Sequence, residues 1–416
     1  MDFAHSPKAQ EMIERLGAFM RDHVLPAEDA YHAELTGVAD WRQWKQPALL
    51  EDLKAKARAA GLWNLFLHDP EHGAGLKVVE YAPLAELMGH SLMAPEIFNC
   101  NAPDTGNMEV LHMYGSPAQQ ERWMLPLLDG KIRSAFCMTE PAVASSDATN
   151  MQATAVPEGD DIVINGRKWF SSGIGHPNCR ILIFMGLTDP TADRHRRHSM
   201  VLVPLDTPGV TIQRMLPSFG LYDEPFGHGE VIFDNVRVPR ENVIAGLGRG
   251  FEIAQGRLGP GRIHHCMRNI GAAERALSML CARADSRVAF GKPLSQLGGN
   301  GDIVANARMA IEQARLLTMK TAWMMDTVGV KAAMSEISQI KVVAPNMAQQ
   351  VLDAAIQMHG ALGVTLDTPL TQLLAYVRTI RLADGPDEVH RKVIARHEWA
   401  RQREARGEPA APGKAG

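Results

Sequence analysis

Three carboxylates stand close together in "RLADGPDEVHR", the stretch from Arg381 to Arg391. They are Asp384, Asp387 and Glu388. One of them on an irregular segment could remove a proton, because burial raises the pKa of a carboxyl group from about 4 toward neutrality. An acidic turn that starts a helix is the alternative, since Pro386 suits a first helical turn and acidic side chains favour the N-terminal dipole.

Two further stretches combine hydroxyl and aromatic side chains. "FCMTEPAVASSDATN" runs from Phe136 to Asn150, and "NGRKWFSSGIG" begins at Asn165 with an Asn-Gly pair typical of a hairpin turn. Aromatic rings beside exposed hydroxyl groups suit a flat heteroaromatic ligand. Local turn chemistry and core packing of Trp169 and Phe170 are the alternatives.

Composition excludes several classes of protein. A net charge of −4 with mixed signs shows no basic footprint for nucleic acid. The five cysteines form no C-x-x-C pair, so we expect reduced thiols, no metal site and a cytoplasmic location. The adjacent His264 and His265 diverge on a helix and have no carboxylate at ligand spacing, so both are interpreted as structural. No apolar run approaches 18 residues, which predicts no membrane segment.

Hydrophobic periodicity predicts the helices and strands that carry these residues. Residues 1–133 show helical spacing, with Ser6 as a predicted N-cap and Pro7 in the first turn. Residues 134–245 are rich in short β-type runs, and residues 246–400 return to long helical patterns. Residues 401–416 are small and polar, which predicts a disordered tail. The expected class is α+β, with two helical domains around a central β domain.

The motifs "CMTEP", "NGRKWFSSG", "RVAFGKPL", "QMHGALG" and "ADGPDEVHR" occur in the order found in flavin-dependent acyl-CoA dehydrogenases. The chain most resembles the dehydrogenase part of the multidomain, 10/11-like subfamily. This resemblance implies an N-terminal helix bundle, a central β-barrel and a C-terminal helix bundle, with FAD held between them.

The resemblance also implies a set of cofactor-binding residues. Met138 and Thr139 would lie beside the flavin pyrimidine, Phe170 against the isoalloxazine and Ser172 near flavin N5. Arg287 would meet the FAD pyrophosphate. A loop from a neighbouring subunit would close over FAD, which implies a homodimer or homotetramer. The loop residues are Gln357, Gly360 and Ala361.

On the substrate side, the resemblance places Ser146 and Gly385 near acyl-CoA, although a spacing difference keeps Ser145 open as the alternative to Ser146. Arg262 lies 25 residues before Arg287, which is the family spacing between an active-site Arg and the FAD Arg. Asp384 falls at the position of the family's catalytic base. Family members of the medium-chain type have Glu there, and Asp is shorter by one methylene, roughly 1.5 Å.

The implied reaction is FAD-dependent α,β-dehydrogenation of an acyl-CoA to the trans-2-enoyl-CoA, as in β-oxidation of fatty acids. Asp384 would take the α-proton, the β-hydrogen would pass as hydride to flavin N5, and an electron-transfer flavoprotein would accept the electrons. The alternatives are an oxidase on the same fold, of the acyl-CoA or nitroalkane type, and a DNA-associated non-enzymatic relative. The charge of −4 argues against the last.

Overall fold

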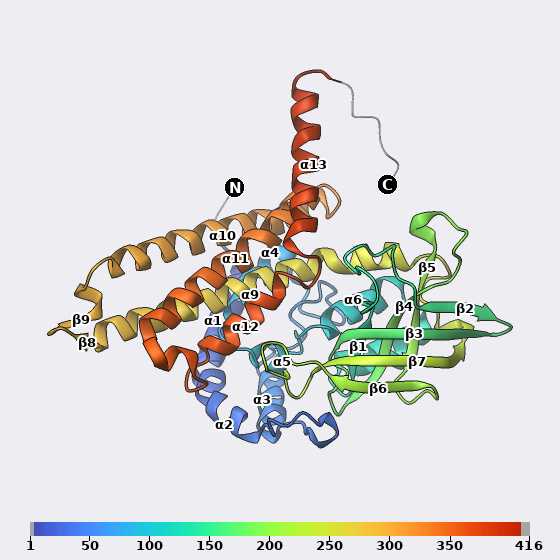
Figure 1. The fold of residues 1–416 in the computed structure, drawn as a ribbon, viewed down its shortest axis with the longest axis horizontal. Coiled ribbons are helices and arrows are strands. Elements are labelled where there is room, and N and C mark those ends of the chain that lie inside the picture. The colour runs from blue at the N-terminus through green and yellow to red at the C-terminus, as the bar shows by residue number, and fades with distance from the viewer. Residues whose placement is uncertain (1–3, 409–416) are drawn as a thin grey trace. The chain divides into compact units, whose positions relative to one another are not determined.

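A computed structural model describes residues 4–408 of the chain (Figure 1). Backbone contacts divide the chain into two units. The helical unit comprises Met1–Ile13, Lys77–Leu92 and Arg262–Gly416, and the sheet unit comprises Glu14–Leu76 and Met93–Gly261. Helices α1 (Pro7–Phe19) and α9 (Gly250–Ser286) have residues in both.

The helical unit is built around one long helix, α11, which packs against α10, α12 and α13. Its buried residues recur every three or four positions, so that one apolar stripe faces the neighbouring helices. Besides parts of α1 and α9, the elements of this unit are α4 (Val78–Met88), β8 (Val288–Ala289), β9 (Lys292–Pro293), η7 (Leu294–Gln296), α10 (Asn300–Val328), α11 (Met334–His359), η8 (Gly360–Val364), α12 (Leu370–Ile380) and α13 (Asp387–Ala405).

The sheet unit contains one seven-stranded sheet where the central β-barrel was predicted. Its strand order is β1-β4-β2-β3-β7-β6, with β5 paired to β4. The strands are β1 (Arg133–Cys137), β2 (Thr154–Glu158), β3 (Asp161–Ser172), β4 (Cys179–Leu187), β5 (His198–Pro204), β6 (Val210–Met215) and β7 (His228–Pro239). The helices of this unit besides α1 and α9 are α2 (Glu28–Glu34), α3 (Ala48–Ala59), α5 (Ala94–Ile97), α6 (Asp104–Tyr114), α7 (Pro117–Gln119) and α8 (Leu125–Leu128).

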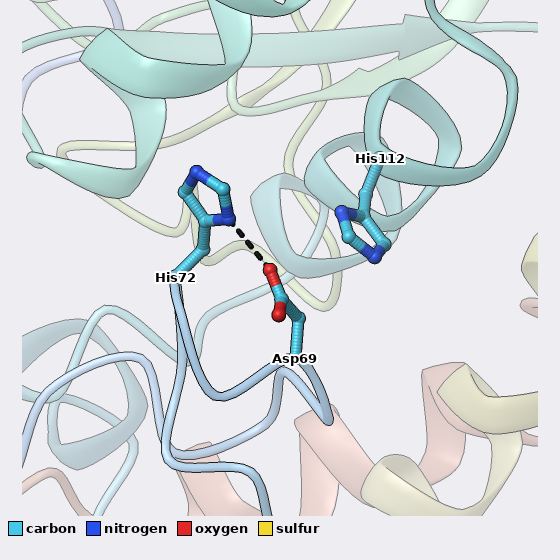
Figure 2. A group of neighbouring side chains, drawn as sticks. All are labelled: Asp69, His72 and His112. Carbon is cyan, nitrogen blue, oxygen red and sulfur yellow. Dashed lines mark hydrogen bonds and ion pairs between the residues drawn. The ribbon is translucent and has the colours of Figure 1, made fainter.

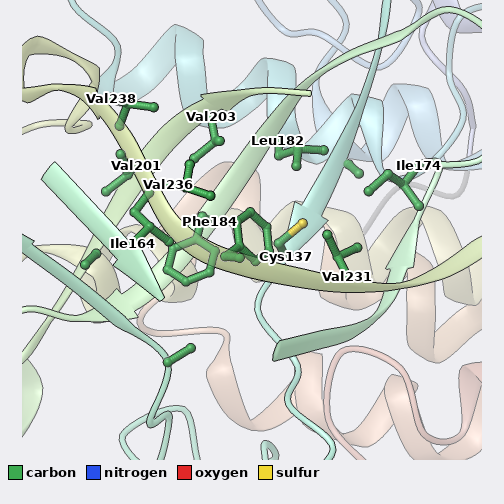
Figure 3. Packing of buried hydrophobic residues seen from close by; sticks show 14 of the residues in the cluster. Cys137, Ile164, Ile174, Leu182, Phe184, Val201, Val203, Val231, Val236 and Val238 are labelled. Atoms are coloured by element: carbon green, nitrogen blue, oxygen red, sulfur yellow. The ribbon is translucent and has the colours of Figure 1, made fainter. Parts of the chain in front are cut away.

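A dry cluster of aliphatic and aromatic side chains fills the core of the sheet unit (Figure 3). Phe184 and Phe233 meet edge to face at its centre, with 4.7 Å between their ring centroids. Val201, Val203 and Leu182 are fully buried beside them. Such β-branched and aromatic residues pack well on a pleated surface, which holds the strands that carry the site residues in a fixed register.

The Asn165-Gly166 pair does not form the predicted hairpin turn, because β3 runs through it without interruption. Residues 159–160 make the turn between β2 and β3 instead. Gly166 has a φ of 143° at a shift in the register between β3 and β7, where the Asn165 side chain accepts a hydrogen bond from the Asn235 N–H at 2.7 Å. The pair therefore marks a bulge inside a strand.

The structure tests the predicted helix cap at Ser6 and the predicted tail from residue 401. The Ala9 N–H donates to Ser6 Oγ at 3.2 Å and α1 begins at Pro7, which confirms the predicted N-cap. Helix α13 continues to Ala405, past the predicted start of the tail at residue 401, and residues 409–416 of that tail lie outside the described residues. Within residues 4–408, no helix is long and apolar enough to cross a membrane.

Candidate active site

The acidic stretch forms a tight turn between α12 and α13 in the helical unit. Asp384 and Gly385 have φ values of 55° and 101°, so two successive residues take left-handed backbone conformations. A Cβ at position 385 would lie 2.9 Å from His390 Nε2. Glycine is therefore required there both for the backbone conformation and for the close approach of the imidazole ring.

The three carboxylates of this turn differ in their surroundings. The Asp387 side chain is 3% exposed and accepts hydrogen bonds from Arg381 at 2.8 Å and Asn346 at 3.0 Å. Burial by itself would raise the pKa of Asp387, but these hydrogen bonds outweigh it and lower the pKa. Glu388 points outward and its side chain is 78% exposed. Asp387 thus forms a structural ion pair and Glu388 is exposed to solvent. Asp384 is therefore the candidate base.

Asp384 lies against a histidine from a distant part of the chain. His265 Nε2, on α9, is 3.4 Å from Asp384 Oδ2, and the Asp384 side chain is 19% exposed. The other ring nitrogen of His265 is 3.4 Å from the hydroxyl of Tyr376 on α12. The sequence interpretation of His265 as merely structural missed this contact. No local spacing signals it, because three separate elements create it.

Three basic side chains hold the backbone of the turn. The Asp384 carbonyl accepts from Arg262 Nη2 at 3.3 Å and lies 3.2 Å from His390 Nε2. Lys341 Nζ donates to the carbonyls of Ile380 and Gly385, the latter at 3.4 Å. The turn is therefore fixed from inside the helical unit.

Burial sets the protonation of these basic groups. Burial lowers the pKa of Lys341 and of Arg262, and the negative charge of Asp384 opposes both changes. Burial lowers the pKa of His390 to about 4, so this ring is neutral near pH 7. Arg262 Nε is buried and has no hydrogen-bond partner among the described residues, which leaves one donor available to a ligand or water at this site.

The predicted flavin-side residues lie at the ends of β1 and β3 in the sheet unit. The Thr139 carbonyl, just after β1, accepts from the Trp169 N–H at 3.0 Å. Phe170 has a φ of 47° and is 44% exposed, while Ser172 Oγ lies 2.8 Å from His228 Nδ1. The structure thus brings the two motifs "CMTEP" and "KWFSSG" side by side.

A fully buried lysine joins these two motifs. Lys168 Nζ donates to the carbonyls of Met138 at 2.8 Å and Met185 at 2.7 Å, and to the Glu140 carboxylate at 2.7 Å. Glu140 in turn accepts from the N–H groups of Gln152 and Ala153. Sequence reasoning missed both charged residues, although each lies inside a quoted motif, because a buried ion pair is invisible until the strands are paired.

The exposed ring of Phe170 suits a flat heteroaromatic group. Trp169 packs edge to face against it, with 5.2 Å between centroids, and the indole Nε1 is buried with no partner among the described residues. An acceptor on the ligand or a water would satisfy this donor. The residues present therefore fit a flavin ring with its polar edge.

The two serines of "SSD" differ in their local contacts. Ser145 Oγ accepts from the Glu140 N–H at 2.9 Å and lies 3.3 Å from the Glu140 carbonyl, so it closes the turn. Ser146 is exposed. This geometry favours Ser146 as the serine that can reach a ligand.

The remaining predicted cofactor residues lie on exposed parts of the helical unit. Arg287 is exposed at the end of α9, next to the β8–β9 hairpin, where Phe290 is 97% exposed. Gln357 is exposed in the last turn of α11, and Gly360 with a φ of 64° and Ala361 follow it. These residues face outward and do not share in the described contacts of Asp384.

Comparison with known proteins agrees with this arrangement. Profiles of the acyl-CoA dehydrogenase N-terminal, middle and C-terminal domains match residues 6–131, 135–236 and 248–399. The chain is 54% identical over 412 residues to "Acyl-CoA dehydrogenase family member 10" of Mus musculus, covering 98% of this chain but only 38% of the mouse protein. It is also 54% identical to "Probable acyl-CoA dehydrogenase FadE2" of Mycobacterium tuberculosis, covering 97% of this chain and 98% of that protein.

A solved structure of a candidate acyl-CoA dehydrogenase from Mycobacterium abscessus is 62% identical, with a TM-score of 0.94 over 96% of this chain and 100% of that chain. The α+β class with helical domains before and after the sheet is thereby confirmed. Three matching domains in order and a nearly full-length relative lead to one conclusion: the chain belongs to the acyl-CoA dehydrogenase family of oxidoreductases.

Proposed function

We propose that the protein catalyses FAD-dependent α,β-dehydrogenation of an acyl-CoA to the trans-2-enoyl-CoA, with Asp384 as the base. The observation that carries this proposal is the contrast within the acidic turn. The Asp387 carboxylate is bound by Arg381 and Asn346, and the Glu388 carboxylate is exposed to solvent. The Asp384 side chain, in contrast, is partly buried, and its backbone lies in a left-handed turn that hydrogen bonds hold in place. A base needs this combination of partial desolvation and fixed orientation.

The turn supports proton removal in two ways. Arg262 and His390 fix the Asp384 carbonyl, which restricts the direction in which the short Asp side chain can reach. The thioester oxygen of the substrate must also be held by donors, since its α-proton is weakly acidic otherwise. The backbone N–H of Asp384 is the protein donor we assign to that oxygen, with Gly385 beside the substrate. FAD held at this site would supply the acceptor for the β-hydrogen, which would leave the substrate as hydride.

Within the sheet unit, four residues are assigned to the flavin. Phe170 would cover the isoalloxazine, and Ser172 would follow the changing protonation near N5, since a hydroxyl both donates and accepts. Met138 and Thr139 would line the pyrimidine edge, on a segment that the buried Lys168 holds in place. On the acyl-CoA side, Ser146 is the exposed serine.

The exposed cofactor residues support assembly into a homodimer or homotetramer. Gln357, Gly360 and Ala361 would cover FAD of a neighbouring subunit, and Arg287 would pair with the pyrophosphate. Apolar side chains near them are open to solvent in the single chain, with Phe290 at 97% and Val364 at 69% exposure. Such exposure suits an interface. Mass in solution tests it, and a monomer that keeps FAD and turns over would contradict it.

Three broader expectations belong to the same proposal. The electron acceptor would be an electron-transfer flavoprotein, the pathway fatty-acid β-oxidation, and the location cytoplasmic. The domain boundaries at residues 133/134 and 245/246 also stay predictions.

Anaerobic titration of the purified flavoprotein with a panel of acyl-CoAs tests the reaction, because the flavin absorbance bleaches when a substrate is oxidised. Asp384→Asn should retain FAD and bind acyl-CoA, yet slow the bleaching by about 10²–10⁴-fold, the usual contribution of a general base. Glu388→Gln is the matched control and should bleach normally.

Two outcomes would revise the proposal. Normal bleaching by Asp384→Asn with a slow Glu388→Gln would move the base to Glu388. Rapid oxygen consumption by the reduced wild-type protein would identify an oxidase on the same fold.

A further inference from the structure

We propose that Asp69, His72 and His112 form a site for a divalent first-row transition metal, with Zn²⁺ as the representative ion (Figure 2). All three residues belong to the sheet unit, and their ligand atoms lie within 4.8 Å of one another. Sequence analysis predicted no metal site on the basis of the cysteines and the adjacent His264 and His265, and it did not consider His72 and His112. The fold alone brings α6 to the loop at residues 69–72.

Two of the three metal-binding residues, Asp69 and His72, lie in a loop whose turn is held by hydrogen bonds. The Gly73 N–H donates to the Asp69 carbonyl at 2.8 Å and the Glu71 N–H donates to Asp69 Oδ1 at 3.1 Å. His72 Nδ1 lies 2.6 Å from Asp69 Oδ2. The side chains of Asp69 and His72 are only 20% and 25% exposed, so both are positioned before any ion arrives.

Helix α6 presents the third donor beside them. The centroids of the His72 and His112 rings are 6.4 Å apart with 63° between the ring planes, and Figure 2 shows both rings next to the Asp69 carboxylate. His112 is only partly buried, so water can reach its ring and complete the coordination sphere. The His112 carbonyl accepts from Gln120 Nε2 at 3.1 Å, which anchors the backbone behind it.

The donor set selects the class of metal. Two imidazoles and one carboxylate suit Zn²⁺ and similar ions, whereas Mg²⁺ and Ca²⁺ prefer oxygen ligands. Bond lengths of 2.0–2.1 Å in a tetrahedral site place donor atoms about 3.3 Å apart. The His72 Nδ1–Asp69 Oδ2 pair, now at 2.6 Å, must therefore open, and any donor pair near the 4.8 Å limit must close. A divalent ion would take the place of the proton between His72 and Asp69.

A hydrogen-bonded loop pair is the competing explanation for Asp69 and His72. That explanation needs only two residues three positions apart and gives His112 no role. The metal site requires all three side chains. His112 is therefore the residue that separates the two explanations, and because it lies outside the buried core, a substitution there is compatible with folding.

Calorimetric titration of the flavin-loaded, EDTA-treated protein with ZnCl₂ tests the site. The wild type should bind one Zn²⁺ that is lost, or weakened roughly tenfold or more, in both His112→Gln and His72→Gln. His32→Gln, which removes an exposed imidazole elsewhere in the sheet unit, should leave binding unchanged. MgCl₂ should give no matching heat.

Thermal unfolding provides a second readout that is independent of activity. Zn²⁺ should raise the Tm of the wild type and of His32→Gln but not that of His112→Gln, since an ion that binds only the folded state stabilises it. Equal Zn²⁺ binding by wild type and His112→Gln would overturn the proposal, as would a wild type that binds no Zn²⁺. Either result would leave a hydrogen-bonded loop pair only.

Discussion

Among single residues, the side chains that contact Asp384 are expected to affect its action as a base as much as its position in the turn does. His265 Nε2 lies 3.4 Å from the carboxylate and Tyr376 lies on the other side of the imidazole ring. A donor beside a carboxylate favours the ionised form. We infer that His265 is a positioning residue, which restricts where the carboxylate of the proposed base can lie.

We expect His265→Phe, which lacks a donor, to shift the acid limb of the kcat/KM profile upward by about one pH unit and to lower the rate at pH 7 by roughly tenfold. His265→Asn, which retains a side-chain donor, should stay closer to the wild type. The pH dependence of flavin reduction measures both. An unchanged acid limb in the Phe variant would reduce His265 to a packing role.

At the scale of elements, the base segment depends on a buried cation from α11. The Lys341 side chain is fully buried, and its ammonium group caps the carbonyl of Ile380 at the end of α12 and that of Gly385 in the turn. Lys341→Met would keep the volume but leave both carbonyls short of a donor. We expect a loss of about 1–3 kcal/mol in the free energy of unfolding, together with slower flavin reduction.

Lys320→Met is the matched control for that change. Lys320 lies on α10 and is 46% exposed, with Glu336 at 3.7 Å. A surface pair of this kind contributes about 0–1 kcal/mol, so the control should unfold close to the wild type in urea. Equal stability of the two variants would show that the turn does not need its buried ammonium group.

The bulge in β3 allows a prediction for the sheet. A Cβ at Gly166 would lie 2.4 Å from the Ala153 Cβ, and its φ of 143° is a conformation that side chains avoid. Gly166→Ala should therefore destabilise the protein by about 2 kcal/mol or more. Gly159→Ala, at a φ of 63° with nothing within 4 Å, should cost only about 1 kcal/mol. Equal losses in thermal unfolding would mean that the contact with Ala153 relaxes freely.

At the scale of the whole molecule, both units contain histidines that burial keeps neutral. Burial lowers the pKa of His390 in the helical unit to about 4 and that of His176 in the sheet unit to about 3. The unfolded chain, with an ordinary histidine pKa of about 6.5, then binds more protons than the folded chain. Each histidine thus contributes stability that is fully present above pH 6.5 and is lost as the pH falls through the folded value.

We expect the Tm to fall between pH 6.5 and pH 4 because of these groups. His390→Gln keeps a side-chain donor for the Asp384 carbonyl but removes the titration, so its Tm should depend less steeply on pH over the same window. Comparing the two slopes isolates His390 from the carboxyl groups that titrate alongside it. Identical slopes would mean that His390 is solvated in the folded protein.

The sequence by itself determined the family, the order of helical and sheet segments, the first helix cap at Ser6, and the acidic turn that holds the proposed base. These features are local. Hydrophobic periodicity, capping chemistry and ordered motifs all act over a few residues to a few turns, and so they can be read along the chain.

Only the tertiary structure showed the different contacts of the three carboxylates, because Arg381 pairs with Asp387, Asn346 donates a hydrogen bond to it, and His265 lies beside Asp384. It also showed Lys168 inside the motif that ends β3. Apart from the Arg381–Asp387 pair, such contacts join residues that lie tens to more than a hundred positions apart, and helix packing and strand pairing decide them. The Asn165-Gly166 pair is a second example. Its sequence is typical of a hairpin turn, but pairing of β3 with its neighbouring strands places it in a bulge instead.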